Sequence, residues 1–220
     1  TDDDFFNIRP SNPAYRFIHN DEKQNVRNFM KDADAVIVST EYLKGQMKSY
    51  SPNIYVIPNM IEVNDMFLSQ RSYDTDKEIR IVYAGGPSHA DDFRGMEGAL
   101  IKILDDFGDK VKIFFMGWMP ECLKIDPRFT NIPWVISPPE YLRRMMELQP
   151  HIGICPLEEN IFNRSKSNGK WLEYTVSGAV TVASNILPFK EVITSGVNGV
   201  IVDNQRARDW YTALADLINN

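Results

Sequence analysis

Short runs of apolar residues alternate along this chain with longer stretches in which apolar residues recur every three or four positions. The short runs predict strands, and the longer stretches predict helices. Strands are expected over residues 36–39, 54–57, 79–84, 111–116, 134–136, 152–155, 180–183 and 199–202. Helices are expected over residues 41–48, 92–107, 138–148, 170–176 and 207–218. Strands alternating with helices predict an α/β fold, with a doubly wound parallel sheet flanked by helices.

The predicted elements divide the 220-residue chain into two unequal parts. Residues 78–220 hold about six strands with connecting helices, which is enough for a whole domain. Residues 1–61 hold two clear strands, too few to bury a core alone, so we expect them to be the tail of a preceding domain. Residues 62–77 are polar without a clear period and are expected to form an inter-domain linker.

Composition narrows the function classes. A net charge of -6 argues against a general nucleic-acid binder, which needs a basic surface. No apolar run approaches the roughly 18–20 residues of a membrane span. Cys122 and Cys155 form no CxxC pair and are expected to be core thiols in a reducing, cytoplasmic environment. The run Asp2-Asp3-Asp4 cannot turn three carboxylates toward one ion from an extended strand, so no metal site is assigned.

A cationic helix start near residue 170 carries the strongest chemical signal. Lys170 and Glu173 are about one helical turn apart, and Lys166 lies one turn earlier, so the three side chains can share a face. Cations and free N–H groups at a helix start can hold the phosphates of a nucleoside diphosphate, and a carboxylate can hold its ribose diol. The alternative is a solvent-exposed helix start whose ion pair contributes only a few tenths of a kcal/mol.

A second candidate is the turn Gly85-Gly86, where a predicted strand passes to a helix. A loop without side chains lets a ligand approach backbone N–H groups at the end of a parallel strand. His89 on the same loop could donate a hydrogen bond to a phosphate or a sugar hydroxyl. The alternative is a loop histidine bonded to a neighbouring carbonyl. Val135, within residues 134–137, is the candidate contact for a nucleobase.

Several ordered motifs resemble nucleotide-sugar glycosyltransferases of the GT-B fold, in the group that includes retaining enzymes of polysaccharide and O-antigen assembly. The matching stretches are ADAVIVSTEYL with IYVIPNMIE, IRIVYAGGPSHADDF, and KSNGKWLEYTVSGAVTVAS with GVNGVIV. The resemblance implies that residues 78–220 form a Rossmann-like domain that binds the sugar donor. It also implies that residues 1–61 end a Rossmann-like domain on the acceptor side.

The resemblance implies a role for each matched position at the helix start. Glu173 matches the second glutamate of the family's paired-glutamate motif and would bind the donor ribose. Lys170, with the backbone around Asn168 and Gly169, would contact the diphosphate. Ser165 stands where the family has its first glutamate, and Lys166 beside it would hold phosphate in compensation.

For the loop that contains the turn Gly85-Gly86, the resemblance implies that Gly85, Gly86 and His89 contact the phosphates and the transferred sugar. His89, Lys166 and Lys170 are therefore the candidate catalytic residues.

The reaction implied is transfer of a sugar from a nucleoside diphosphate sugar to a saccharide or lipid-linked acceptor. It would need neither a metal nor any cofactor beyond the donor itself, and we expect a hexosyltransferase-like reaction. The acceptor-side half could also bring the enzyme to a membrane surface. Two alternatives stay open, namely a non-catalytic nucleotide- or partner-binding module and, less favoured, a sugar-nucleotide epimerase.

Overall fold

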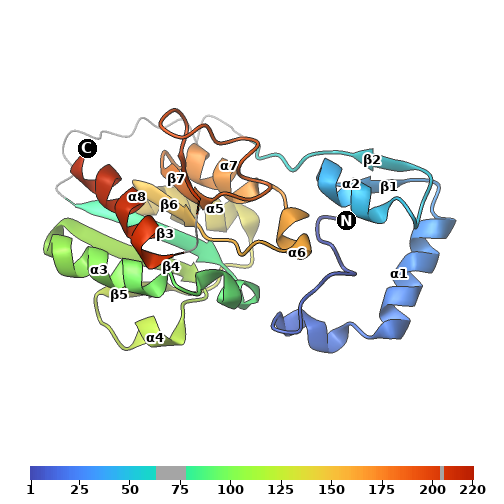
Figure 1. The fold of residues 1–220 in the computed structure, drawn as a ribbon, viewed down its shortest axis with the longest axis horizontal. Helices are drawn as coiled ribbons and strands as arrows, with labels where there is room; N and C mark the ends of the chain where they lie inside the picture. Colours follow the sequence, from blue (N-terminus) through green and yellow to red (C-terminus); the bar gives the residue numbers. More distant parts are fainter. Residues whose placement is uncertain (63–77, 204–205) are drawn as a thin grey trace.

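The chain folds into two parts that lie side by side in a computed structural model, which describes residues 1–62, 78–203 and 206–220 (Figure 1). The larger part contains the sheet expected for residues 78–220, and the smaller part is formed by residues 1–62. Almost all of the linker predicted at 62–77 lies outside the described residues.

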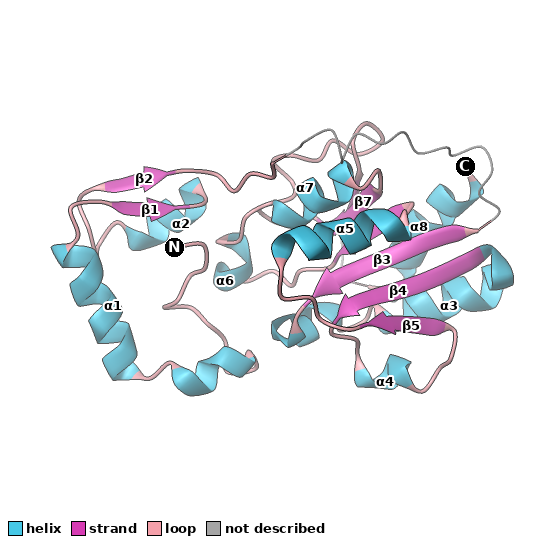
Figure 2. Cartoon of the chain, turned by 180° about the vertical axis from the view of Figure 1, so that it is seen from behind, coloured by secondary structure: helices cyan, strands magenta, loops and turns pink. Residues whose placement is uncertain are grey.

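Six strands of the larger part form one sheet in which every pairing is parallel. They are β3 (Ile79–Gly85), β4 (Val111–Gly117), β5 (Phe129–Ile132), β6 (Ile152–Cys155), β7 (Val180–Ser184) and β8 (Val200–Val202). Their order across the sheet is β5-β4-β3-β6-β7-β8. Figure 2 shows β5, β4 and β3 side by side, from the side opposite to Figure 1. This arrangement confirms the predicted α/β fold.

Helices cover both faces of the sheet. The helices of the larger part are α3 (Glu97–Phe107), α4 (Glu121–Lys124), α5 (Pro138–Leu148), α6 (Ile161–Arg164), α7 (Gly169–Val176) and α8 (Ala207–Asn219), of which α6 lies between the sheet and the smaller part. On one face, Leu100 of α3 and Trp210 of α8 pack in the same buried cluster as Ile113 of β4. On the other face, Met145 of α5 and Tyr174 of α7 pack on the sheet. Figures 1 and 2 show α3 and α8 on one face and α5 and α7 on the other. Strands covered on both sides are largely apolar, with Arg80 and Lys112 near the starts of β3 and β4, which explains the short apolar runs in the sequence.

The smaller part has a core of its own. Its elements are α1 (Asn20–Asp32), β1 (Val36–Val38), α2 (Glu41–Met47) and β2 (Ile54–Val56), preceded by a 3₁₀ helix (Pro13–Phe17). The strands β1 and β2 pair in parallel. Val38 of β1 packs with Met30 of α1 and with Leu43 and Met47 of α2. Residues 1–12 run along the seam between the two parts (Figure 1). None of the helices in the described ranges is both long and apolar enough to span a bilayer.

One predicted strand was wrong, and one helix was missed. The strand expected at 134–136 is a loop, and the strand that pairs with β4 is β5, Phe129–Ile132. This edge strand carries one buried residue, Phe129, so its apolar signal is weaker than that of the following Trp134-Val135-Ile136. The helix α1 was missed because a single residue of it, Met30, is buried and the rest of its surface is mostly polar.

The helix expected over 92–107 is broken. Residues Pro87–Phe93 form a 3₁₀ helix, and α3 begins at Glu97 after Gly95, whose φ of 83° is a left-handed conformation that interrupts the helix. The end at Gly108 is as predicted, with a φ of 54°.

The two cysteines have different environments. Cys155 is buried in β6, as expected, but Cys122 in α4 is exposed, so the prediction of two core thiols was wrong for Cys122.

Candidate functional site

The centre of the sheet contains the topological switch point of the fold. From β3 the chain proceeds outward through β4 and β5, whereas β6, β7 and β8 extend the sheet in the opposite direction. A crevice therefore opens at the carboxyl ends of β3 and β6, the place where open parallel sheets bind ligands. The turn Gly85-Gly86 follows β3 at this edge, and the segment leading to α6 and α7 follows β6.

The side chain of Tyr174 in α7 holds this crevice open at its base. Ladder pairing between β3 and β6 covers only Ile81–Ile152 and Val82–Gly153. Beyond it, the Tyr174 hydroxyl accepts a hydrogen bond from the Ala84 N–H at 3.0 Å and lies 3.4 Å from the carbonyl oxygen of Ile154. The two strands diverge above a fully buried phenol that satisfies a backbone donor.

A cavity of about 250 Å³ lies at this carboxyl edge. Its wall combines an apolar loop, the end of the sheet and the first turns of α5 and α7, with the lining residues Gly85, Met116, Pro133, Trp134, Val135, Ile136, Pro138, Tyr141, Lys170 and Glu173. A mostly apolar hollow with a few convergent polar groups is the usual form of a small-molecule site.

The polar groups of the cavity form one cluster. The Lys170 ammonium lies 2.7 Å from Glu173 Oε2, and the Tyr141 hydroxyl donates to the same oxygen at 2.6 Å. Lys170 also donates to the Tyr141 oxygen at 3.2 Å and lies 5.0 Å from the centre of its ring. Burial, followed by the nearby Glu173 charge, raises the pKa of Tyr141 well above its usual value, so this hydroxyl remains a donor.

The apolar side of the cavity is formed by residues 133–136. Trp134 is 63% exposed and lies close to Gly86, which follows β3, and to Gly117, which ends β4. A Cβ at Gly117 would lie 2.6 Å from Trp134 Cε3 and 2.7 Å from the Gly85 carbonyl oxygen, and Gly117 has a φ of 101°. Any larger residue at 117 would therefore displace Trp134 from the cavity rim.

The structure brings together four of the residues selected from the sequence. Gly85, Val135, Lys170 and Glu173 all line the cavity. Gly86 lies at its edge, because a Cβ there would lie 3.7 Å from Trp134 Cζ3.

Asn168 and Gly169 form the start of α7, as N-cap and first residue, and lie outside the cavity lining. Their backbone nevertheless begins the helix that carries Lys170 and Glu173.

Ser165 and Lys166 lie outside the cavity lining, against the N-terminal segment. Ser165 is fully buried, and its hydroxyl lies 3.0 Å from the Ile161 carbonyl oxygen and 3.4 Å from Asp4 Oδ2. The Lys166 ammonium lies 3.5 Å from Asp3 Oδ1 and 4.6 Å from the centre of the Phe162 ring. Because α7 begins at Gly169, Lys166 is not part of that helix. The prediction that Lys166 shares a helix face with Lys170 and Glu173 was therefore wrong.

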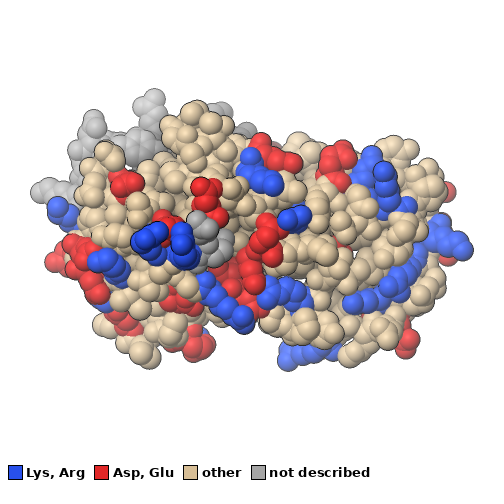
Figure 3. Space-filling model, viewed as in Figure 1, with Lys and Arg blue, Asp and Glu red and all other residues tan. Residues whose placement is uncertain are grey.

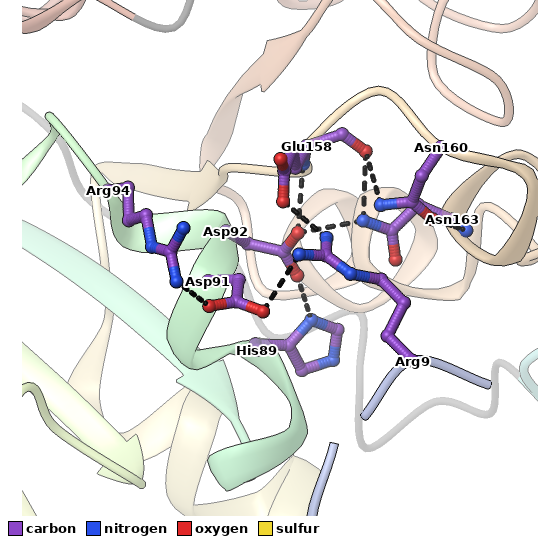
Figure 4. A network of polar contacts seen from close by, with 8 residues as sticks. All are labelled: Arg9, His89, Asp91, Asp92, Arg94, Glu158, Asn160 and Asn163. Carbon is purple, nitrogen blue, oxygen red and sulfur yellow. Dashed lines mark hydrogen bonds and ion pairs between the residues drawn. The ribbon is translucent and has the colours of Figure 1, made fainter. Parts of the chain in front are cut away.

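His89 belongs to a separate polar network on the loop after β3. Its Nδ1 lies 2.8 Å from Asp92 Oδ2, and the other oxygen of Asp92 accepts hydrogen bonds from the Glu158 N–H at 2.8 Å and the Asn163 side chain at 2.7 Å (Figure 4). Through these hydrogen bonds Asp92, which is 5% exposed, connects the loop after β3 to the loop after β6. It lies within the 3₁₀ helix Pro87–Phe93 and not at the start of α3.

Arg9 reaches this network from the N-terminal segment. Its guanidinium bonds Asp91 Oδ2 at 2.9 Å and also pairs with Glu158, while Arg94 pairs with the other oxygen of Asp91 (Figure 4). On the face shown in Figure 3, Asp and Glu side chains gather near the middle of the molecule with Lys and Arg side chains beside them. Within the described ranges, no group of three or more His, Cys, Asp or Glu residues is arranged to hold a metal ion.

Sequence reasoning missed Tyr141, Arg9 and the tie made by Asp92. Tyr141 lies in the first turn of a predicted helix, at the same edge of the sheet as Lys170. Because ligands bind at the carboxyl ends of parallel strands, this position could have been predicted as part of the site. Arg9 carried no comparable signal, because its partners Asp91 and Glu158 lie far away in the sequence.

Solved structures match this fold, although no protein-family model matches the chain and no curated protein matches its sequence significantly. WaaG, a glycosyltransferase involved in lipopolysaccharide biosynthesis, is similar with a TM-score of 0.64 and 10% identity, over 94% of this chain and 60% of WaaG. The pneumococcal O-GlcNAc transferase GtfA, solved with UDP and GlcNAc, has a TM-score of 0.62 and 17% identity, over 90% of this chain and 40% of GtfA. HepE of Anabaena, solved with UDP and glucose, has a TM-score of 0.58 and 13% identity, over 93% of this chain and 58% of HepE.

This chain therefore has the fold of the GT-B glycosyltransferases, with a parallel Rossmann-like sheet flanked by helices. The resemblance seen in the sequence motifs is confirmed at the level of the fold. The chain spans between 40% and 60% of the length of these three structures.

Proposed function

We propose that this chain is the donor-binding part of a glycosyltransferase that transfers a sugar from a nucleoside diphosphate sugar to a saccharide or lipid-linked acceptor. The observation that carries the proposal is the Lys170–Glu173 pair at the start of α7, which opens into a cavity of about 250 Å³ at the switch point of the sheet. GtfA and HepE, which share the fold, were each solved with UDP and a sugar.

In this proposal, different lining residues of the cavity contact the base, the ribose and the diphosphate of the nucleotide. The apolar residues at 133–136 offer flat contacts to a base, Glu173 accepts hydrogen bonds from ribose hydroxyls, and Lys170 with the first N–H groups of α7 faces the diphosphate. Stabilisation of the leaving diphosphate by fixed cations and N–H groups would lower the barrier to transfer without a metal.

Finer features of the proposal rest on the motif resemblance. They are a hexosyl donor, retention of anomeric configuration, action in polysaccharide assembly, a cytoplasmic location and contact with a membrane through the acceptor-side half. His89 and Lys166 enter it as residues near the transferred sugar and the phosphates, but reaching them would require displacement of their present partners Asp92 and Asp3.

The test is a thermal-shift panel of UDP, GDP, ADP, CDP and dTDP. A nucleotide at about 100 times its dissociation constant stabilises the folded chain by roughly 2.7 kcal/mol. Substitution of Glu173 by Gln removes the charged acceptor and is expected to weaken binding by about 1–3 kcal/mol. Glu147→Gln is the matched control, because Glu147 pairs with Arg143 on the exposed side of α5. A panel without any shift contradicts the proposed site.

A non-catalytic nucleotide-binding module is the second candidate, and a specific observation favours it. Ser165 replaces the carboxylate implied by the resemblance and is fully buried beneath Asp4. Donor turnover separates the two functions: hydrolysis or transfer of the sugar supports the enzyme, whereas tight nucleotide binding with no turnover by the full-length protein supports the module.

A further inference from the structure

The two oxygens of the Glu173 carboxylate have different environments. Oε2 accepts hydrogen bonds from the Tyr141 hydroxyl at 2.6 Å and from Lys170 at 2.7 Å. Oε1 has no hydrogen-bond partner among the residues that the structure describes, and the Glu173 side chain is partly exposed in the cavity wall. One oxygen is therefore held by protein donors, and the other is available to a ligand.

Tyr141 comes from a different element than the carboxylate that it contacts. It lies on α5, directly after the apolar loop at 133–136, whereas Glu173 and Lys170 lie on α7. Its ring packs against the buried cluster beneath these helices, which restricts the position of the hydroxyl. A hydrogen bond from a fixed phenol restricts the rotation of a carboxylate more than a bond from the flexible side chain of Lys170 does.

We propose that Tyr141 is a positioning residue for ribose recognition, which holds Glu173 Oε2 so that Oε1 faces the ribose hydroxyls of the donor nucleotide. This inference rests on the proposed function and adds a residue and a role to that same site. It implies that selection for ribose depends on a hydroxyl group that itself never contacts the sugar.

Removal of the hydroxyl has a defined consequence. In the Tyr141→Phe variant the ring and its packing remain, but Oε2 loses its 2.6 Å donor and Lys170 loses one of its two acceptors. Lys170 can then pair with either carboxylate oxygen, so Oε1 is no longer reserved for the ligand. The apolar loop at 133–136 and the N–H groups at the start of α7 do not contact the Tyr141 hydroxyl, so the loss should fall mainly on the ribose contacts.

The experiment compares ribonucleotide with deoxyribonucleotide binding by titration calorimetry. It uses the diphosphate that binds in the panel above, together with its 2′-deoxy and 3′-deoxy forms. A hydrogen bond to a charged acceptor predicts that the wild-type chain binds the ribonucleotide about tenfold or more tightly than at least one deoxy form. In Tyr141→Phe this preference should fall to less than about threefold, with little change in affinity for the deoxy forms.

The matched control is Tyr211→Phe, which removes another phenol that donates to a carboxylate, Asp106 Oδ2, at 2.6 Å on the opposite face of the sheet. It should leave the ribose preference unchanged. General structural damage would weaken ribonucleotide and deoxyribonucleotide binding equally, so the ratio separates positioning from folding.

Three results overturn the inference in distinguishable ways. An unchanged ribose preference in a folded Tyr141→Phe chain contradicts the positioning role while leaving nucleotide binding intact. An equal loss of affinity for all forms shows that Tyr141 acts only in packing. Absence of any nucleotide binding by the wild-type chain contradicts the proposed function itself, and the role of Tyr141 is refuted with it.

Discussion

At the scale of single residues, the contact between Gly153 and Tyr174 shapes the base of the crevice. The Tyr174 ring lies directly over β6, and a Cβ built on Gly153 would lie 2.2 Å from Tyr174 Cδ2. Only glycine leaves room for the phenol whose hydroxyl caps the Ala84 N–H. The small residue in the strand thus determines where β3 and β6 can diverge.

This contact gives the first stability prediction. We expect Gly153→Ala to lower the free energy of unfolding by about 1–3 kcal/mol, because an added methyl group forces the ring from its packed position. Urea denaturation measures the change. Gly45→Ala is the control, since nothing lies within 4 Å of its Cβ and alanine in helix α2 should stabilise by about 0.5–1 kcal/mol. Equal effects of the two substitutions would contradict the close packing.

At the scale of elements, Thr40 joins the start of α2 to the segment before α7. Its Oγ1 accepts a hydrogen bond from the Leu43 N–H at 3.1 Å as the helix N-cap, and it donates to the Ser165 carbonyl oxygen at 3.1 Å. One hydroxyl therefore serves both parts of the molecule.

The second stability prediction concerns this cap. Thr40→Val keeps the shape of the side chain but leaves the Leu43 N–H and the Ser165 carbonyl without their partner, and we expect a loss of about 1–2 kcal/mol, seen as a lower melting temperature. Thr40→Ser retains the hydroxyl and should restore most of the loss. A stable Thr40→Val chain would show that water replaces both bonds.

The elements also show which sequence signals are reliable. Strands buried on both faces, such as β3 and β4, and the amphipathic body of α3 follow directly from the apolar pattern. The edge strand β5 and the polar helix α1 do not, because each buries a single side chain and its position depends on neighbouring elements. The break before α3 depends on one left-handed glycine, Gly95.

At the scale of the whole molecule, the segment before α1 connects the two parts through charged contacts. Arg9 pairs with Asp91 and Glu158, which lie on the loops that flank the crevice, and Asp3 approaches Lys166. The position of this segment therefore depends on the same loops that would surround a bound donor.

The last prediction tests this connection. Arg9→Met should release residues 1–12 from the larger part, because Asp91 and Glu158 lose their shared cation, and limited proteolysis should then cleave this segment faster. Arg94→Met is the control, since Arg94 also pairs with Asp91 but is 74% exposed and lies within the same loop. If both variants are cleaved at the wild-type rate, the Arg9 contacts do not hold the segment.

The apolar pattern and the turn residues were enough to predict the α/β class and the approximate positions of the buried strands. They also predicted the turn at Gly85 and the helix start at Lys170 where a site could form. These features are local, because periodicity and glycine turns depend on neighbouring residues. The cavity and the contacts among its lining residues, by contrast, depend on the tertiary structure. The bond from Tyr141 to Glu173 spans 32 residues and that from Arg9 to Glu158 spans 149, and such contacts arise only when the packed sheet brings separate loops to one edge.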